Sequence, residues 1–386
     1  MLEEPPLNFD YQSTTPCLDE VQEAMAPYWA EHWGNSSSRH SLDGLNASAA
    51  VSVARDRLAS FLGATPERLI FTSGATEANN LALLGHARAS AMRRGGPGHL
   101  ITLATEHRAV LDPLRRLQRE GFTLTELLPG ADGLLDMNQL IEAIQKDTIL
   151  VSIMAGNNEI GVIQPLSEIG SICKANNITF HSDAAQSFGH IPLFPDSCGI
   201  KLLSLSAHKL YGPKGIGALL FCPDVAIEPI AWGGSQERSL RPGTVPVPLV
   251  VGFSKAAEFA FAEIIARGKK LKFLRNQLWD LLRVNVPNLM LNGSLEDRLP
   301  HNLNITIPGI NGRKLLREIR PLISCSSGSA CSMGEPSHVL QALGRTKEEA
   351  RSSLRLSLGR DTTLDDVHKV VKVLVNSIEK LQKIDG

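Results

Sequence analysis

The stretch LSLSAHKLYGPKG, residues 203–215, joins a short apolar run to a histidine, a lysine and a glycine-rich turn. The stretch ITFHSDAAQS, residues 178–187, likewise places an aspartate directly after an apolar run. Strands buried on both faces of a parallel sheet have this apolar character. Ligands of such sheets bind beyond the carboxyl ends of the strands. The two stretches therefore predict an α/β fold with a functional site at Asp183 and Lys209.

The same alternation extends outward on both sides, from about residue 68 to residue 222. Strands are predicted at 69–71, 100–103, 122–127, 148–154, 178–181, 202–205 and 217–221, and helices at 76–89, 110–120, 137–145 and 166–175. Apolar strands that alternate with helices predict a mostly parallel sheet flanked by helices on both faces.

A nearly unbroken helical pattern covers residues 246–284, and after it the pattern of predicted strands and helices changes. Strands are predicted at 302–307, 322–324 and 354–358, and helices at 313–319 and 364–383. A chain of 386 residues is too long for one small core. We therefore expect a large domain over residues 16–255 and a smaller α+β domain formed by residues 1–15 and 256–386.

The composition argues against a nucleic-acid-binding protein, a membrane protein and a metal site. The formal net charge is -1, so no electrostatic attraction to nucleic acid or to an anionic membrane is expected. No apolar run reaches transmembrane length, and the acidic start of the chain does not resemble a basic leader. The six cysteines form no CxxC pair and no metal-ligand spacing. We expect free thiols, no metal site and a cytoplasmic location.

Lys209 and Asp183 together indicate one cofactor, although most lysines are merely solvated surface charges. A lysine amine at a strand end can form a Schiff base with the aldehyde of pyridoxal 5'-phosphate (PLP). A buried aspartate needs a cationic or hydrogen-bonding partner, and the protonated pyridine nitrogen of PLP supplies one. Gln186 follows Asp183 by three residues and can reach the same ring.

Other polar stretches after strands each allow a functional and a plain structural interpretation. The turn 72–77 is either an anion site at a helix start or an ordinary helix cap. His107 either stacks on the cofactor ring or caps a helix, and the amides at 157–158 either bind a ligand or form a turn. The loop 233–244 holds phosphate-type donors or simple turns. Arg355 either grips a carboxylate or lies on an exposed strand face.

Cys331 lies in SCSSGSACSMGEP, residues 324–336, a composition typical of a loop. Serine and glycine neighbours cannot bury a thiol well, and a cysteine thiol is strongly nucleophilic even when only partly ionised. Cys331 is therefore the reactive candidate. Cys325, at the end of a predicted strand, is expected to be structural, and Cys17, Cys173, Cys198 and Cys222 are expected to be buried.

Taken together, and in their order along the chain, these motifs resemble those of the cysteine desulfurases. These enzymes are the NifS/IscS-like members of the class V aminotransferase family, which has PLP fold type I. The resemblance runs from residues 10–16 to residues 357–360. It implies a PLP-dependent transferase fold with a mostly parallel sheet. It also implies conversion of L-cysteine to L-alanine with a persulfide on Cys331, which supplies sulfur for Fe–S cluster assembly or other sulfur-containing cofactors.

The resemblance also implies residue roles. Lys209, Cys331 and His107 would be catalytic, and Asn158 and Arg355 would bind the substrate carboxylate. The residues implied to bind PLP are Ala75, Thr76, Asp183, Gln186, Ser206, His208 and, from the other subunit of a homodimer, Thr244. A sulfur-acceptor or Fe–S scaffold protein is the implied partner.

One departure concerns the loop after Cys331, which reads SMGEP and is about two residues shorter than Ser-Ala-Ser-Leu-Glu-Pro, so its reach is smaller. Two other functions use the same PLP site. One is a class V aminotransferase or carbon–sulfur lyase that does not need Cys331, and the other is a non-catalytic PLP-binding assembly subunit. The serine- and glycine-rich surroundings of Cys331 favour the desulfurase.

Overall fold

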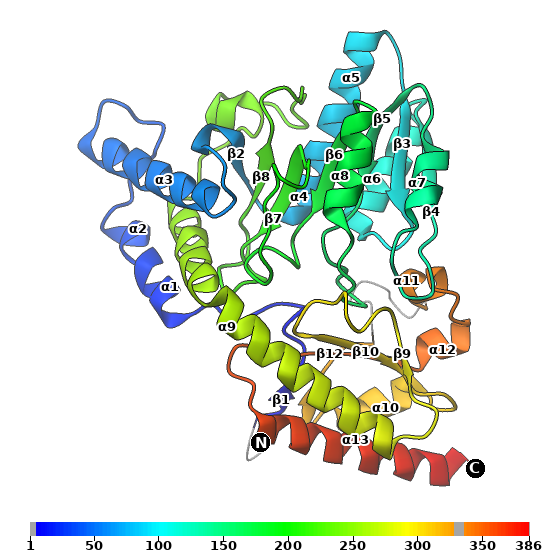
Figure 1. Ribbon diagram of the computed structural model, residues 1–386. Helices are drawn as coiled ribbons and strands as arrows, with labels where there is room; N and C mark the ends of the chain where they lie inside the picture. The colour runs from blue at the N-terminus through cyan, green and yellow to red at the C-terminus, as the bar shows by residue number, and fades with distance from the viewer. Residues whose placement is uncertain (1–4, 328–335, 386) are drawn as a thin grey trace.

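The computed structural model describes residues 5–327 and 336–385 (Figure 1). Within them a seven-stranded sheet has the order β2-β8-β7-β6-β5-β3-β4. Its strands are β2 (Leu69–Thr72), β3 (His99–Leu103), β4 (Thr123–Leu127), β5 (Thr148–Ser152), β6 (Thr179–Asp183), β7 (Leu202–Ser206) and β8 (Gly217–Phe221). Strands β3 to β7 pair in parallel, and β8 is antiparallel to both of its neighbours. The mostly parallel sheet is thus confirmed.

Helices cover both faces of this sheet. One face packs against α3 (Leu42–Ser60), α7 (Met137–Ala143), α8 (Leu166–Ala175) and the first half of α9 (Val247–Asn285). The other packs against α4 (Ala75–Asn80), a π-helical turn η2 (Leu81–Gly85), α5 (His86–Arg94) and α6 (Arg108–Gln118). On β3, Ile101 and Leu103 face the first core while Leu100 faces the second. Because neighbouring side chains point to opposite faces, a doubly covered strand is apolar throughout.

A second layer lies below the large sheet in Figure 1. It contains an antiparallel sheet of order β12-β10-β9 and a parallel pair of β1 with β11. The strands are β1 (Leu7–Asn8), β9 (Met290–Leu291), β10 (Asn302–Thr306), β11 (Ile323–Ser324) and β12 (Ser353–Ser357). The helices are α10 (Gly312–Ile319), α11 (His338–Ala342), α12 (Lys347–Arg351) and α13 (Leu364–Asp385). The N-terminal strand therefore joins the C-terminal layer.

Helix α9 connects the two layers. Its residues up to Ala260 belong to the core of the large sheet, and those from Leu271 onward belong to the core of the second layer. The division predicted between residues 255 and 256 falls inside this helix. We propose that residues 16–255 form one domain and that residues 1–15 with 256–386 form the other, with α9 as a stiff connection.

Some elements were not predicted from the sequence. Helix α3 has the sequence LDGLNASAAVSVARDRLAS, in which alanine and serine blur the apolar periodicity. The short helices α1 (Asp19–Met25), α2 (Pro27–Ala30), α11 and α12 and the 3-10 turns η1 (Pro66–Arg68) and η3 (Gln236–Ser239) were also missed. None of the described helices is both long and apolar enough to cross a membrane.

Candidate active site

A cavity of about 560 Å³ opens at the carboxyl ends of the parallel strands. It collects all of the predicted site residues of the described chain except Thr244. These are Ala75, Thr76, His107, Asn158, Asp183, Gln186, Ser206, His208, Lys209 and Arg355. Thr244 is exposed outside this cavity, and Cys331 lies outside the described residues. These residues come from six separate segments of the chain, which meet as the position of the strand ends predicts.

Asp183 is the last residue of β6 and is 6% exposed. Its Oδ2 accepts a hydrogen bond of 2.6 Å from Nδ2 of Asn79, and its Oδ1 accepts one of 2.8 Å from the backbone N–H of Ala185. These two donors fix the carboxylate in one orientation at the cavity wall. No sequence pattern marked Asn79, since it is one of two adjacent asparagines in a short helix.

Lys209 follows β7 and contacts the N-terminal segment. Its Nζ donates to the backbone carbonyls of Gln12 at 2.6 Å and Ser13 at 2.8 Å. Nε2 of Gln186 donates to the same Gln12 carbonyl at 3.1 Å. Nε2 of His190 donates to the Lys209 carbonyl at 2.7 Å, which holds the backbone beneath the amine. The N-terminal contribution was missed, because nothing in residues 10–14 marks them as neighbours of a lysine so distant in sequence.

Donors suited to a phosphate lie beside Lys209. The hydroxyl of Ser206 is buried and has no hydrogen-bond partner among the described residues. Such a group is costly unless something else binds it. The backbone of Ala75 and Thr76 begins α4 at the same cavity, and Nδ1 of His208 lies 3.1 Å from the Thr14 hydroxyl. The unpartnered Ser206 hydroxyl, the fixed carboxylate of Asp183 and the cavity volume all fit PLP.

His107 caps a helix, which confirms one of its two interpretations, and stacking on the cofactor ring stays a prediction. It is the N-cap of α6, where its Nδ1 accepts a 3.0 Å hydrogen bond from the backbone N–H of Ala109, and it also lines the cavity. Burial lowers the pKa of His107, and the positive charge of Lys209 lowers it further, while Asp183 opposes both. The imidazole is therefore neutral at pH 7, with its proton on Nε2 and that proton available to the cavity.

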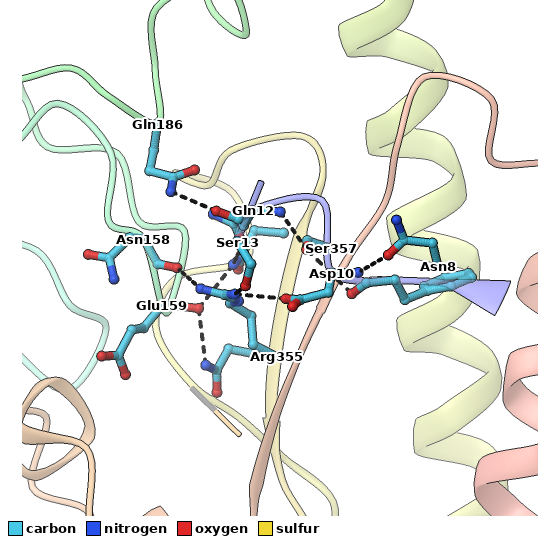
Figure 2. A network of polar contacts seen from close by, with 12 residues as sticks. Asn8, Asp10, Gln12, Ser13, Asn158, Glu159, Gln186, Arg355 and Ser357 are labelled. Atoms are coloured by element: carbon cyan, nitrogen blue, oxygen red, sulfur yellow. Dashed lines mark hydrogen bonds and ion pairs between the residues drawn. The ribbon is translucent and has the colours of Figure 1, made fainter. Parts of the chain in front are cut away.

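Arg355 is 3% exposed, so the interpretation as a surface arginine is wrong. Figure 2 shows its guanidinium among the N-terminal segment and the Asn158 turn. Nη1 donates to the Asn158 carbonyl at 2.7 Å, and Nη2 donates to Oδ1 of Asp10 at 2.8 Å and to Oγ of Ser13 at 2.7 Å. The Nε of Arg355 has no partner among the described residues, and neither has Oδ1 of Asn158. These free polar atoms fit a bound carboxylate and amine.

Two buried carboxyls border the site and were not singled out from the sequence. Oε1 of Glu106 accepts a 2.6 Å hydrogen bond from the backbone N–H of Met154, and burial raises the pKa of Glu106 well above its usual range. Oε2 of Glu159 accepts a 2.5 Å hydrogen bond from the Ser337 hydroxyl, and burial raises the pKa of Glu159. The only sequence signal was adjacency, because each directly precedes or follows a predicted site residue.

The raised pKa of Glu106 predicts how stability depends on pH. The folded protein keeps a proton that the unfolded protein releases above about pH 4.5. The stability that Glu106 contributes is therefore full below that pH and is lost as pH rises toward the folded pKa. A Glu106→Gln variant does not titrate, so its unfolding free energy should rise relative to wild type by about 1.4 kcal/mol per pH unit in this window. Urea unfolding at about pH 5 and about pH 6 measures this difference. Parallel pH profiles for the two proteins would contradict a raised pKa.

The cysteines differ in part from expectation. All five within the described residues are free, and Cys173 is buried as predicted. Cys17, Cys198 and Cys222 are only partly buried, because they lie at element ends where loops leave one side open. Burial raises the pKa of Cys325 to about 12, with Asp10 adding to the shift. That thiol is protonated at neutral pH, which suits a structural role.

The comparisons of this chain with known proteins agree with one another. Residues 7–370 match the family model described as Aminotransferase class-V. The chain is similar to "Cysteine desulfurase IscS" of Rickettsia prowazekii, with 43% identity over 98% of this chain and 92% of that protein. It is similar to the solved structure of a "NIFS-LIKE PROTEIN", with TM-score 0.91 and 34% identity over 97% of this chain and 100% of that one. The structure "SspA in complex with cysteine" gives TM-score 0.81 and 36% identity over 92% of this chain and 100% of that one. These likenesses extend over both layers.

Proposed function

Because the chain belongs to the aminotransferase class-V family, and within it to the cysteine desulfurases, we propose that it is a PLP-dependent enzyme that transfers sulfur from L-cysteine to Cys331. The reaction is L-cysteine plus the Cys331 thiol giving L-alanine plus a Cys331 persulfide. The persulfide supplies sulfur for Fe–S cluster assembly or for other sulfur-containing cofactors. The observation that carries this proposal is the meeting of Asp183, Lys209 and Arg355 in one cavity.

The cavity residues divide among the parts of the cofactor. Asp183 would keep the pyridine nitrogen protonated, and Gln186 would donate to the phenolic oxygen. Ser206, His208 and the start of α4 at Ala75 and Thr76 would hold the phosphate, helped by the partial positive charge of a helix N-terminus. When bound, PLP supplies an electron sink for the bond broken at the substrate Cα.

The chain's own residues bind the substrate and move its protons. Arg355 and Asn158, which both line the cavity, would hold the substrate carboxylate, and the unpartnered Nε of Arg355 is a donor available for it. The amine of Lys209 would take the Cα proton, and the Gln12 and Ser13 carbonyls accept hydrogen bonds from this amine when it is not bound to the cofactor. Neutral His107 would return a proton to the carbon skeleton. The Cys331 thiolate would attack the substrate sulfur, and the carbon–sulfur bond electrons would stay with the alanine product.

Product stoichiometry tests the function against its two alternatives. With L-cysteine and a thiol reductant, we expect equal amounts of alanine and sulfide over many turnovers. Without reductant, alanine should stop near one equivalent per Cys331, because the persulfide is not removed. A carbon–sulfur lyase would form pyruvate in place of alanine, and an aminotransferase would release no sulfide. A non-catalytic subunit would give neither product.

The assembly and location are further parts of this proposal. We propose a homodimer in which Thr244 reaches the phosphate of the second subunit, and its exposure outside its own cavity supports this. Exposed Trp29 and Trp33, at 62% and 71% of full exposure, give the dimer an apolar surface beside α2. A sulfur-acceptor or Fe–S scaffold protein would then accept the sulfur. The free thiols of the described cysteines support a cytoplasmic location.

Arg355→Lys should lower kcat/KM for L-cysteine by roughly 30- to 1000-fold, or about 2–4 kcal/mol. The planar guanidinium contacts Asp10, Ser13 and Asn158 at once and still has N–H donors for a substrate. A lysine ammonium has three donors and cannot keep those contacts while also gripping a carboxylate. Steady-state kinetics with PLP saturation checked by absorbance is the measurement. Wild-type kcat/KM in this variant would place carboxylate binding elsewhere, with Arg360 the next candidate.

A further inference from the structure

The segment from Gly233 to Thr244, which we call the arm, joins β8 to α9 and has an unusual backbone. Three successive residues that are not glycine, Glu237, Arg238 and Ser239, have φ of 43°, 61° and 62°. Side chains with a Cβ atom disfavour this left-handed region, and single residues visit it far more often than runs do. Such a backbone persists only where the surrounding structure holds it.

A buried ion pair holds one end of the arm. The carboxylate of Glu237 receives two parallel hydrogen bonds from Arg55 on α3, from Nη1 at 2.8 Å and from Nη2 at 2.6 Å. Its Oε2 also accepts a 2.7 Å hydrogen bond from the backbone N–H of Phe71 on β2, the edge strand of the large sheet. The side chain of Glu237 is only 4% exposed. The left-handed turn is thus bound to α3 and to the edge strand of the large sheet by charge-assisted hydrogen bonds.

A second ion pair ties the arm to the chain's own cavity. Nε of Arg241 donates to Oε1 of Glu77 at 3.0 Å. Oε2 of Glu77 accepts a 2.5 Å hydrogen bond from the backbone N–H of Ser73, in the turn that begins α4 and lines the cavity. Thr244 follows Arg241 by three residues and is exposed. The arm is therefore fixed within the left-handed turn by Glu237 and after it by Arg241, while Thr244 at its end does not line the chain's own cavity.

We propose that Glu237 is a positioning residue that, through Arg55 and β2, holds the arm so that Thr244 contacts the cofactor phosphate of a second copy of the chain. The inference rests on the proposed function, because it uses the same PLP cavity. Without the carboxylate, the Phe71 N–H loses its partner, Arg55 retains its 2.6 Å hydrogen bond to the Leu69 carbonyl but no longer holds the arm, and the left-handed turn relaxes. Thr244 then loses its fixed position, although every residue of the other subunit's cavity is unchanged.

The first test is PLP affinity. Apo-protein titrated with PLP and followed by absorbance should show a dissociation constant about 10- to 100-fold higher for Glu237→Ala than for wild type, the usual worth of a hydrogen bond to a charged group. Glu258→Ala is the matched control. It removes another glutamate paired with an arginine of α3, but that pair is exposed and its atoms lie 3.4 Å apart. Its PLP affinity should equal that of wild type, and an equal loss in both variants would overturn the proposal.

A pair of heterodimers separates positioning across the interface from a general structural effect. In the first, one subunit carries Lys209→Ala and the other carries Glu237→Ala. In the second, one subunit carries both substitutions and the other is wild type. Each heterodimer has the same two substitutions and a single site that retains Lys209. Two affinity tags allow each to be purified, and borohydride reduction after titration with PLP labels only the intact lysine.

We expect the first heterodimer to bind PLP with wild-type affinity, because its intact site receives an intact arm from the partner. The second should bind as weakly as the Glu237→Ala homodimer. The reverse pattern would mean that the arm acts within its own subunit, and equal affinities would mean a structural effect, so either result overturns the proposal. Because the readout is cofactor attachment, it holds even for a chain that fails to release sulfur from cysteine. The failure of the two proposals can therefore be told apart.

Discussion

Lys209→Ala is expected to abolish alanine formation from L-cysteine, with a fall in kcat on the order of 10⁴-fold or more, since proton transfer alone contributes roughly 10²- to 10⁴-fold. The variant loses both the covalent attachment point and the amine that takes the Cα proton. It also leaves the Gln12 and Ser13 carbonyls without a cation. PLP should still bind without a covalent bond, held by Asp183 and Ser206.

Borohydride reduction followed by peptide mapping checks the attachment directly. In wild type the pyridoxyl group should be found on Lys209, and in Lys209→Ala no lysine should carry it. Lys214 lines the same cavity and is the alternative attachment point. A label on Lys214 in the wild-type protein would contradict the assignment.

Cys331→Ser should stop sulfur release while leaving PLP binding intact. A serine hydroxyl is not ionised near neutral pH and forms no persulfide, so the sulfur of the substrate has no acceptor. We expect an unchanged cofactor absorbance, an unchanged response of that absorbance to added cysteine, and sulfide at background. Mass spectrometry of the wild-type protein after cysteine alone should find one added sulfur on the peptide that contains Cys331.

Cys325→Ser is the matched control for this prediction, because it makes the same substitution in the same stretch of chain. The pKa of Cys325, raised to about 12, keeps that thiol protonated at neutral pH. The control should therefore release sulfide at nearly the wild-type rate. Full desulfurase activity in Cys331→Ser would remove the persulfide route and leave the carbon–sulfur lyase.

The sequence was sufficient for the large sheet and for most of the cavity. Apolar strands buried on both faces are readable by eye, and polar residues directly after them, such as Asp183 and Lys209, fall at the carboxyl edge of a parallel sheet. Local patterns also left two interpretations of His107, and the structure shows the helix cap at the cavity wall, where stacking on the cofactor ring is still a prediction. For Arg355 the sequence indicated a strand but could not tell whether that face of the strand was covered.

What the sequence could not supply are the partners of these residues. Asn79 meets Asp183 across 104 positions, and Asp10 meets Arg355 across 345. Such pairs arise from the packing of whole layers, and no local period or turn signal records them. The buried carboxyl of Glu106 was overlooked for a related reason. The pKa of Glu106 depends on its complete burial. Burial is a property of the folded chain and cannot be read from the neighbouring residues 105 and 107.

The Asp10–Arg355 ion pair has a consequence for how the protein is made. Figure 2 shows Arg355, a residue of β12, beside Asp10 and Ser13 of the N-terminal segment, so two parts of the chain that are distant in sequence meet at the site. During synthesis the large sheet can complete its core once the first half of α9 has left the ribosome, since domains generally fold as units from the N-terminus onward. The segment around Asp10 is synthesised before the large sheet, and its partner on β12 is synthesised after it. The protein is therefore loaded with its cofactor after the chain has been released from the ribosome, because a nascent chain lacks the part of the pocket that β12 supplies.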